Sequence, residues 1–497
     1  KTIMLFINLF ENDLKLFLPE FFLVTAILTL VLYGSVYSVS KEYNYPLINV
    51  STCWATIFTL VNTFILVLFT REVSSVIFNG TFICDLLSQN AKLFVIGATI
   101  VCLLISIPYV RNYQVNSFEY FLLILLAVFG LMLLCSSFDL ISVYLAIELQ
   151  SLCLYVLAAF NRESAYSTEA GLKYFILGAF ASGLLLFGMS IIYGFTGTTN
   201  FEDLHILFSL DAENHQAIQT GIIFISCAFL FKMAASPFHV WSPDVYDGAP
   251  LNSTIFFAVV PKIALIVIFL RLFVFCFGSQ PQYWQYLASF CAVSSVVTGS
   301  FMALKQRKLK RLLAYSSIGH VGYILIALSS GGLEGFHASM IYIVTYMLMG
   351  VGVWSVVSCL ENNISVKRTR TLADLAMISR TNPVLAFSSA ILIFSMAGVP
   401  PLAGFYAKFC VFTSSINASM YVYSILIILV SVVSTYYYIR LIKTVYFEKV
   451  SIKAFYKPIS KEISLVLAFS FFFTIFFFIN PNLLWLVTYE MVLCVVQ

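Results

Sequence analysis

Four ionisable side chains lie inside long apolar stretches of the sequence. A charged group at the centre of a membrane span costs at least about 2.5–3.5 kcal/mol, so each one needs an explanation. A lysine removed from water holds its proton less tightly, and a nearby carboxylate reverses that effect. We interpret the set as a proton pathway of coupled sites, with ion pairing between helices as the alternative. The residues are Glu148 in YLAIELQSLCLYVL, Lys232 in FKMAASP, Lys262 in VVPKIAL and Lys408 in GFYAKF.

Other polar residues have two interpretations each. His320 in YSSIGHVGYIL suits a proton relay, because histidine exchanges its proton near neutral pH. The alternative for His320 is a packing role between helices. Lys173 in GLKYFILGAF lies near the start of its span, so it either joins the pathway or extends its ammonium to the membrane surface. Glu20, beside Pro19, is interpreted as a helix-start acid outside the pathway. A group of three polar residues follows later in the chain, after the proline that ends this stretch. They either lie at a cavity mouth or belong to a solvated loop: His239, Asp244 and Asp247.

The composition indicates what must surround these residues. Of 497 residues, 61% are apolar and 10% are charged, against about 25% charged in an ordinary soluble domain. A helix that crosses the hydrocarbon layer needs about 20 mostly apolar residues, and such stretches follow one another along the whole chain. The sequence therefore predicts an all-α membrane protein with about fourteen spans. The predicted spans centre near residues 27, 60, 100, 128, 149, 182, 230, 264, 293, 321, 346, 398, 430 and 471.

Several classes of site receive no support from the motifs. The 11 cysteines are scattered without a CxxC cluster, which argues against an iron–sulfur or zinc site. There is no Gly-rich nucleotide loop after a strand, no GxSxG and no HExxH. The net charge of +4 is small and gives no indication of a nucleic-acid partner. If the chain is part of an enzyme, we expect the redox chemistry on another chain.

The loops between the predicted spans alternate in charge. Basic residues on the inner side are expected to follow alternate spans, and here every basic loop follows an odd-numbered span. This alternation supports the count of fourteen and predicts both termini on the outer side. The basic residues are Lys305, Arg307, Lys308, Lys310, Arg311, Lys367, Arg368, Arg370, Arg380, Arg440, Lys443, Lys449, Lys453 and Lys457, and an acidic loop carries Glu202, Asp203, Asp211 and Glu213.

A short internal repeat coincides with two predicted helix breaks. FKMAASP, Phe231 to Pro237, and FSMAGVP, Phe394 to Pro400, both match F-x-M-A-x-x-P. Proline removes a backbone donor and clashes with the preceding turn, so we expect breaks at Pro237 and at Pro400-Pro401. Interrupted helices in corresponding halves of a membrane protein indicate a transport site built from inverted repeats.

At these residues the sequence resembles the subunit 2 family of respiratory NADH:ubiquinone oxidoreductase (complex I), in its long, fourteen-helix form. The similarity covers roughly residues 135–445. It is carried by YLAIELQSLCLYVLAAF, STEAGLKYFILGAFASGLLLFG, AFLFKMAASPFHVWSPDVYDGAP, LKRLLAYSSIGHVGY and SMAGVPPLAGFYAKF.

The resemblance implies an antiporter-like fold with two inverted five-helix repeats and two broken helices. It divides the chain into an N-terminal three-helix segment (1–115), a first repeat (116–280), a second repeat (281–448), and a last helix with a tail (449–497). It also implies family roles in the proton pathway for Glu148, Lys173, Lys232, Lys262, His320 and Lys408.

The same resemblance implies a proton-pumping subunit of an NADH:ubiquinone reductase in the mitochondrial inner membrane. No cofactor is expected on this chain, whereas FMN, iron–sulfur clusters and ubiquinone are expected on other subunits. The expected partners are other membrane-arm subunits and membrane lipids. Two alternatives remain at this point: a subunit of a multi-chain cation/proton antiporter, and a membrane scaffold whose charges only pair helices.

Overall fold

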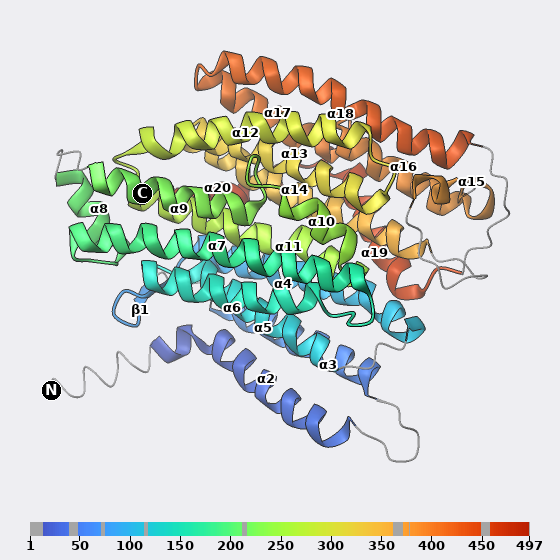
Figure 1. Cartoon of the computed structure of the whole chain (residues 1–497), viewed down its shortest axis with the longest axis horizontal. Coiled ribbons are helices and arrows are strands. Elements are labelled where there is room, and N and C mark those ends of the chain that lie inside the picture. Colours follow the sequence, from blue (N-terminus) through green and yellow to red (C-terminus); the bar gives the residue numbers. More distant parts are fainter. Residues whose placement is uncertain are drawn as a thin grey trace.

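The computed structural model describes residues 13–38, 48–70, 75–113, 118–210, 216–360, 371–376, 378–448 and 458–496. Most of the helices run side by side along the horizontal of Figure 1. The first part of the chain forms α2 (Leu18–Tyr37), α3 (Asn49–Phe69), the antiparallel strands β1 (Ser75–Ile77) and β2 (Phe82–Cys84), and α4 (Leu86–Tyr113).

The described residues after α4 form mainly helices, two of which are interrupted. The next elements are α5 (Glu119–Ser136), α6 (Leu140–Ala158), α7 (Ala165–Thr196), α8 (Phe201–Leu210), α9 (Gln216–Met233), α10 (Trp241–Gly248) and α11 (Leu251–Phe269), which continues as the π-helix η1 (Leu270–Cys276). They are followed by α12 (Pro281–Leu304), α13 (Leu309–Ser329), α14 (Gly332–Cys359), η2 (Leu372–Leu375), α15 (Ile378–Thr381), α16 (Pro383–Ala397), α17 (Ala403–Asn417), α18 (Tyr421–Phe447), α19 (Lys461–Phe476) and α20 (Asn482–Val496).

Twelve helices of the described part are long and apolar enough to cross a membrane. The two remaining predicted spans are shorter in the structure. The span predicted near residue 398 is the pair α16 and α17 on either side of a break, and the span near 471 is the 16-residue helix α19. The prediction of an all-α membrane protein is confirmed. Thirteen of the fourteen predicted centres lie within a helix, and the one near residue 398 lies at the break between α16 and α17.

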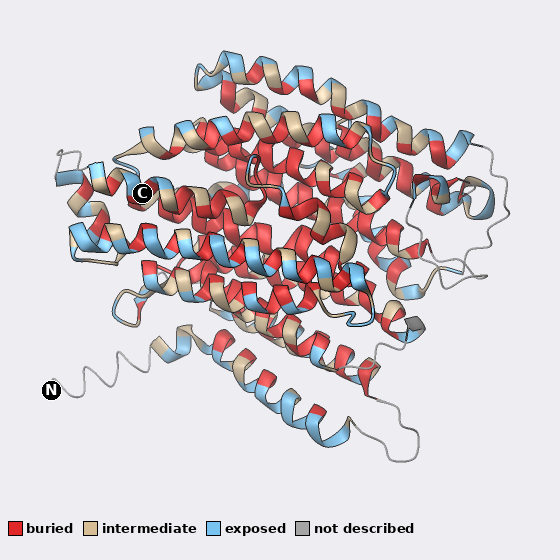
Figure 2. Ribbon diagram, in the orientation of Figure 1, coloured by how far each residue is buried: buried red, intermediate tan, exposed pale blue. Residues whose placement is uncertain are grey.

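The helices differ strongly in how far they are buried, as Figure 2 shows. In their most apolar stretches, 89% of the residues of α11 and α13 and 94% of those of α14 are buried inside the protein. The corresponding values are 28% for α2 and 33% for α18, which lie along opposite edges of the bundle in Figure 1. Lys262 on α11 and His320 on α13 therefore lie in protein and not against the surrounding lipid.

Part of the loop pattern used in the sequence prediction lies outside the described residues. This concerns Asp211, Glu213, Lys367, Arg368, Arg370, Lys449, Lys453 and Lys457. The basic residues between α12 and α13 are described, and there Lys308 Nζ contacts Asp247 Oδ2 at 2.6 Å.

Two buried ion pairs tie the N-terminal helices to the rest of the bundle. Lys92 Nζ on α4 lies 2.6 Å from Glu20 Oε1 on α2, and both side chains are almost fully buried. Glu20 is in the first turn of its helix as expected, but it is not a simple helix-start acid. Arg271 in η1 donates to both carboxylate oxygens of Asp85 at 2.7 Å. Asp85 also caps α4 by accepting from the amide of Ser88 at 2.8 Å.

We predict that Lys92→Met lowers the free energy of unfolding by about 3–5 kcal/mol, because the Glu20 carboxylate is then left buried without its partner. The double variant Glu20→Leu/Lys92→Met should recover most of this loss, because both charges are replaced by apolar groups of similar size. Thermal unfolding of the purified protein measures both effects.

The exposed Lys461→Met provides a matched control, and we expect its unfolding to resemble that of the unmodified protein. A Lys92→Met protein as stable as this control would contradict the assignment of a buried pair between α2 and α4.

Candidate functional site

Both interrupted helices end in the same way. At the end of α9, Ala234 has a positive φ of 62°, and the amide of Ala235 donates to the Leu230 carbonyl at 2.9 Å. At the end of α16, Gly398 has a φ of 86°, and the amide of Val399 donates to the Phe394 carbonyl at 3.1 Å. Helices commonly end in this way, with one residue in the left-handed conformation and the next amide bonded to the carbonyl five positions earlier. The prolines Pro237, Pro400 and Pro401 follow these two ends, in the segments before α10 and α17.

Side chains bind the carbonyls that the breaks leave free. The indole Nε1 of Trp241 donates to the carbonyl of Phe231 at 3.0 Å, so the start of α10 closes the end of α9. At the second break, Lys408 Nζ donates to the carbonyl of Ala397, the last residue of α16, at 2.8 Å. The C-terminal end of a helix carries a partial negative charge, which stabilises an ammonium there. The second break therefore holds a lysine in place without a carboxylate.

Glu148 and Lys232 form the first part of the candidate site. Glu148 lies in the middle of α6, and its carboxylate interacts electrostatically with the Lys232 ammonium near the end of α9. The Lys232 ammonium also donates to the hydroxyl of Tyr155 at 3.3 Å. Glu148 Oε1 is buried and has no hydrogen-bond partner among the described residues. This part of the site thus holds a buried carboxylate oxygen that is free to accept a hydrogen bond.

Lys262 and His320 form the central part. The Lys262 ammonium donates to the hydroxyl of Tyr346 on α14 at 3.3 Å and lies 5.0 Å from the centre of its ring. Both ring nitrogens of His320 have hydroxyl partners, with Nδ1 at 2.8 Å from Tyr342 and Nε2 at 3.1 Å from Tyr438. The His320 ring lies 5.1 Å from that of Tyr346. Lys262 and His320 therefore share one tyrosine-lined region between α11, α13, α14 and α18.

Lys408 adjoins this region from the other side. A cavity of about 10 Å³, close to the smallest space that holds one water, is lined by Lys408, His320 and Tyr323 together with neighbouring residues of α12 and α18. The Lys408 ammonium lies 5.3 Å from the centre of the Tyr323 ring, and that ring stacks on Tyr342 at 5.9 Å. Lys262, His320 and Lys408 thus form a continuous polar region inside the second half of the chain.

Between Lys232 and Lys262 the described contacts are aromatic. Tyr155 meets Tyr174 edge-on at 4.8 Å, and Tyr174 stacks on Trp241 at 4.7 Å. Tyr174 also packs against Phe257 of α11 at 6.0 Å. The candidate site therefore has two polar regions separated by aromatic rings.

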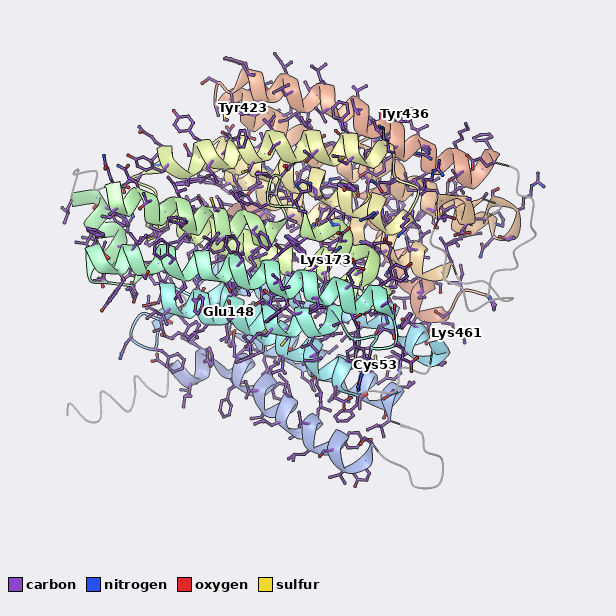
Figure 3. The ribbon with its side chains drawn as sticks, in the orientation of Figure 1. Cys53, Glu148, Lys173, Tyr423, Tyr436 and Lys461 are labelled. Atoms are coloured by element: carbon purple, nitrogen blue, oxygen red, sulfur yellow. The ribbon has the colours of Figure 1, made fainter. Side chains whose placement is uncertain are left out.

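Lys173 lies away from both regions. Its ammonium contacts Glu169 at 2.7 Å and Asp244 at 3.0 Å, and Arg311 binds the other oxygen of Asp244. Figure 3 shows Lys173 closer than Glu148 to the end of the bundle where Lys461 lies. The structure therefore groups Lys173 with Glu169, Asp244 and Arg311, and not with the central row. Of the possible cavity-mouth residues, His239 is half-buried and follows the first break.

The sequence interpretation did not include the tyrosines that connect the charged groups. Tyr342 and Tyr346 are four residues apart, and residues at this spacing lie on one face of a helix. Tyr155 follows Glu148 by seven residues on α6, which also places both on one face. The spacing from a buried charge would therefore have indicated Tyr155, whereas the spacing of Tyr342 and Tyr346 indicates only that they share a face of their helix. Two buried ion pairs were also not predicted from the sequence. They are Glu20 with Lys92 and Asp85 with Arg271.

Known proteins share both the sequence and the fold. Residues 137–435 match the family described as NADH:quinone oxidoreductase/Mrp antiporter, TM. The chain is 44% identical to NADH-ubiquinone oxidoreductase chain 2 of Marchantia polymorpha over 493 residues, which are 98% of this chain and 99% of the relative. It is 45% identical to NADH-quinone oxidoreductase subunit N of Paramagnetospirillum magneticum over 397 residues, 79% of this chain and 81% of the relative.

A solved structure agrees with this assignment. A chain of respiratory complex I from Thermus thermophilus, solved with bound aureothin, is similar with a TM-score of 0.78 and 28% identity. The similarity covers 94% of this chain and 98% of that one. The chain belongs to the NADH:quinone oxidoreductase/Mrp antiporter family, and within it to the group of NADH-ubiquinone oxidoreductase chain 2 and NADH-quinone oxidoreductase subunit N.

Proposed function

We propose that this chain is a proton-translocating subunit in the membrane arm of a mitochondrial NADH:ubiquinone oxidoreductase. Protons pass through Glu148, Lys232, Lys262, His320 and Lys408, and quinone reduction on other subunits drives them. The observation that carries the proposal is the continuous contact from Lys262 through Tyr346 and the His320 region to Lys408. Family membership supports the coupling to the oxidoreductase.

The groups of the central region have the chemistry that proton transfer requires. A tyrosine hydroxyl both donates and accepts, and Tyr346 accepts from Lys262 while its own hydroxyl donates to the Ala258 carbonyl at 3.4 Å. A neutral imidazole carries one proton and accepts another on the opposite nitrogen. Because both nitrogens of His320 face tyrosine hydroxyls, a proton accepted from one side is released on the other. His320 therefore acts as the relay between Lys262 and Lys408.

Glu148 controls the first region. Its negative charge stabilises the charged form of Lys232, so a loss of that charge releases a proton from the lysine. The aromatic contacts of Tyr155, Tyr174 and Trp241 then separate Lys232 from Lys262. Proton transfer between the two lysines requires water to enter between these rings, which makes the contact a gate between the two regions.

We also propose the family's division of the chain and its orientation. The first repeat (116–280) and the second repeat (281–448) are supported by their breaks, which separate α9 from α10 and α16 from α17. With basic loops on the inner side, both termini lie in the intermembrane space, and Lys173 with Asp244 lies at the inner mouth of the pathway. FMN, iron–sulfur clusters and ubiquinone belong to other subunits of the complex, and this chain binds none of them.

A cation/proton antiporter subunit is the second candidate, because the matched family includes Mrp antiporters. Copurification distinguishes the two. An assembly that oxidises NADH supports the oxidoreductase subunit, whereas an assembly without redox cofactors supports the antiporter.

We predict that Lys232→Met slows proton transfer by about 10²–10⁴-fold, the usual contribution of a positioned acid–base group. The reason is that the thioether cannot carry the proton that Glu148 controls. Proton uptake into vesicles that contain the assembled complex, measured together with NADH oxidation, gives the ratio of protons moved to electrons transferred.

Lys461→Met is the matched control, because it removes an exposed lysine at the end of the bundle (Figure 3). We expect its proton-to-electron ratio to equal that of the unmodified complex. An assembled Lys232→Met complex with an undiminished ratio would remove Lys232 from the pathway.

We predict that Tyr346→Phe leaves assembly intact and lowers proton transfer. The phenyl ring keeps the contact with the Lys262 ammonium, whereas the hydroxyl that links Lys262 to the Ala258 carbonyl is lost. The lipid-facing Tyr436→Phe is the control and should pump normally. Equal pumping in the two variants would show that protons bypass the Tyr346 hydroxyl.

A further inference from the structure

A cavity with a nearly apolar lining lies away from the proposed proton pathway, between α3, α4, α14, α19 and α20. Its volume is about 430 Å³. On α4 the lining runs along one face through Asn90, Phe94, Gly97 and Val101, and on α14 it includes Met347 and Val351. Val101 lies eleven residues after Asn90, which corresponds to roughly 16 Å at 1.5 Å per residue. The cavity is therefore a long slot that follows α4 into the membrane.

A glycine leaves the middle of this slot open. A Cβ atom built on Gly97 would meet no other atom within 4 Å, so the backbone of α4 faces empty space there. Gly352 on α14, in contrast, lies against Leu392 and Ser470 with contacts under 3 Å from such a Cβ. The void at Gly97 leaves its lining atoms without contact partners on one side, and an apolar occupant restores those contacts.

One end of the slot carries a polar group without a partner. Asn90 is 3% exposed, and its Nδ2 has no hydrogen-bond partner among the residues that the structure describes. Asn90 lies four residues after Leu86, where α4 begins, and so close to one surface of the membrane. A buried amide donor of this kind requires an acceptor.

The occupant must combine an apolar body with a hydrogen-bond acceptor at one end. The lining along α4 and α14 is almost entirely apolar, and the free donor of Asn90 lies at one end of it. The carbonyls of a spanning helix are already bonded within that helix, so a helix of a partner subunit has no acceptor for Asn90. A hydrocarbon chain is apolar along its whole length, and the ester group at the head of a phospholipid chain provides the acceptor.

We propose that this slot is a binding site for one acyl chain of a phospholipid, with its ester carbonyl accepting a hydrogen bond from Asn90 Nδ2. The chain extends past Gly97 toward Val101 and fills the space between α4 and α14. The bound lipid joins the N-terminal helices to α14, the helix that carries Tyr342 and Tyr346. This site does not depend on the proton relay, and its test does not use pumping.

The proposal is tested by photolabelling the assembled complex in lipid vesicles. The vesicles contain a phosphatidylethanolamine that carries a photoreactive diazirine in the middle of one acyl chain. After a detergent wash, illumination and peptide mass spectrometry, we expect labelling of α4 and α14 residues that line the slot. Labelling of the exposed face of α7 should be lost in the wash, because lipid there exchanges freely.

Two variants and one control identify the site. Gly97→Leu fills the slot without a clash and should reduce its labelling to the level of the exposed helix faces. Asn90→Leu removes the polar anchor and should reduce retention roughly fivefold, the contribution of one ordinary hydrogen bond. Gly183→Leu is the matched control, because its Cβ would also meet nothing within 4 Å but it faces outward on α7. It should leave the labelling of the slot unchanged.

Three results would overturn the proposal. They are a label in the slot that washes out as fast as the label on α7, labelling that Gly97→Leu leaves unchanged, and capture of a partner subunit's helix in place of lipid. If Gly97→Leu fails to assemble on a native gel, Asn90→Leu decides the question alone, and unchanged retention in that variant would contradict the site.

Discussion

Inside a membrane, every backbone group that a helix break leaves free must find a partner within the protein. The two breaks of this chain meet that requirement with side chains. Trp241 donates to the carbonyl of Phe231, and Lys408 donates to the carbonyl of Ala397. The second case links backbone structure directly to function, because the donor that completes the helix end is also an ionisable group. The position of Lys408 thus follows from the break itself.

The buried cations differ in the kind of partner that they contact. Lys92 and Arg271 each contact a carboxylate, at 2.6 and 2.7 Å, and these ion pairs join their helices to other parts of the bundle. Lys262 and Lys408 instead contact neutral groups, a tyrosine hydroxyl and a backbone carbonyl. A cation without a carboxylate partner gains little from staying charged in a dry interior, so it exchanges its proton more readily. Lys232 lies between these cases, since Glu148 acts on it while a tyrosine hydroxyl accepts its hydrogen bond.

Tyrosine hydroxyls link ionisable side chains that lie on different helices. The hydroxyls of Tyr342, Tyr346 and Tyr438 connect α11, α13, α14 and α18 around His320, in the most deeply buried part of the bundle. Tyr155 and Tyr174 instead meet through their ring faces and edges, and they separate Lys232 from Lys262. The same residue type therefore makes hydroxyl contacts between helices around His320 and ring-to-ring contacts between Tyr155 and Tyr174.

Patterns within single helices were sufficient to predict the fold class, the positions of the spans, the two breaks and the presence of Glu148, Lys232, Lys262 and Lys408 within apolar helices. These features are local, because hydropathy, proline and charge act within one helix. The contacts between charges became visible in the packed structure alone. That structure placed Lys173 with Asp244 and paired Glu20 with Lys92, 72 positions further along the chain. It also brought Tyr346 to Lys262 across 84 positions. Such partners depend on how helices pack and rotate against one another, and no spacing along the chain records that geometry.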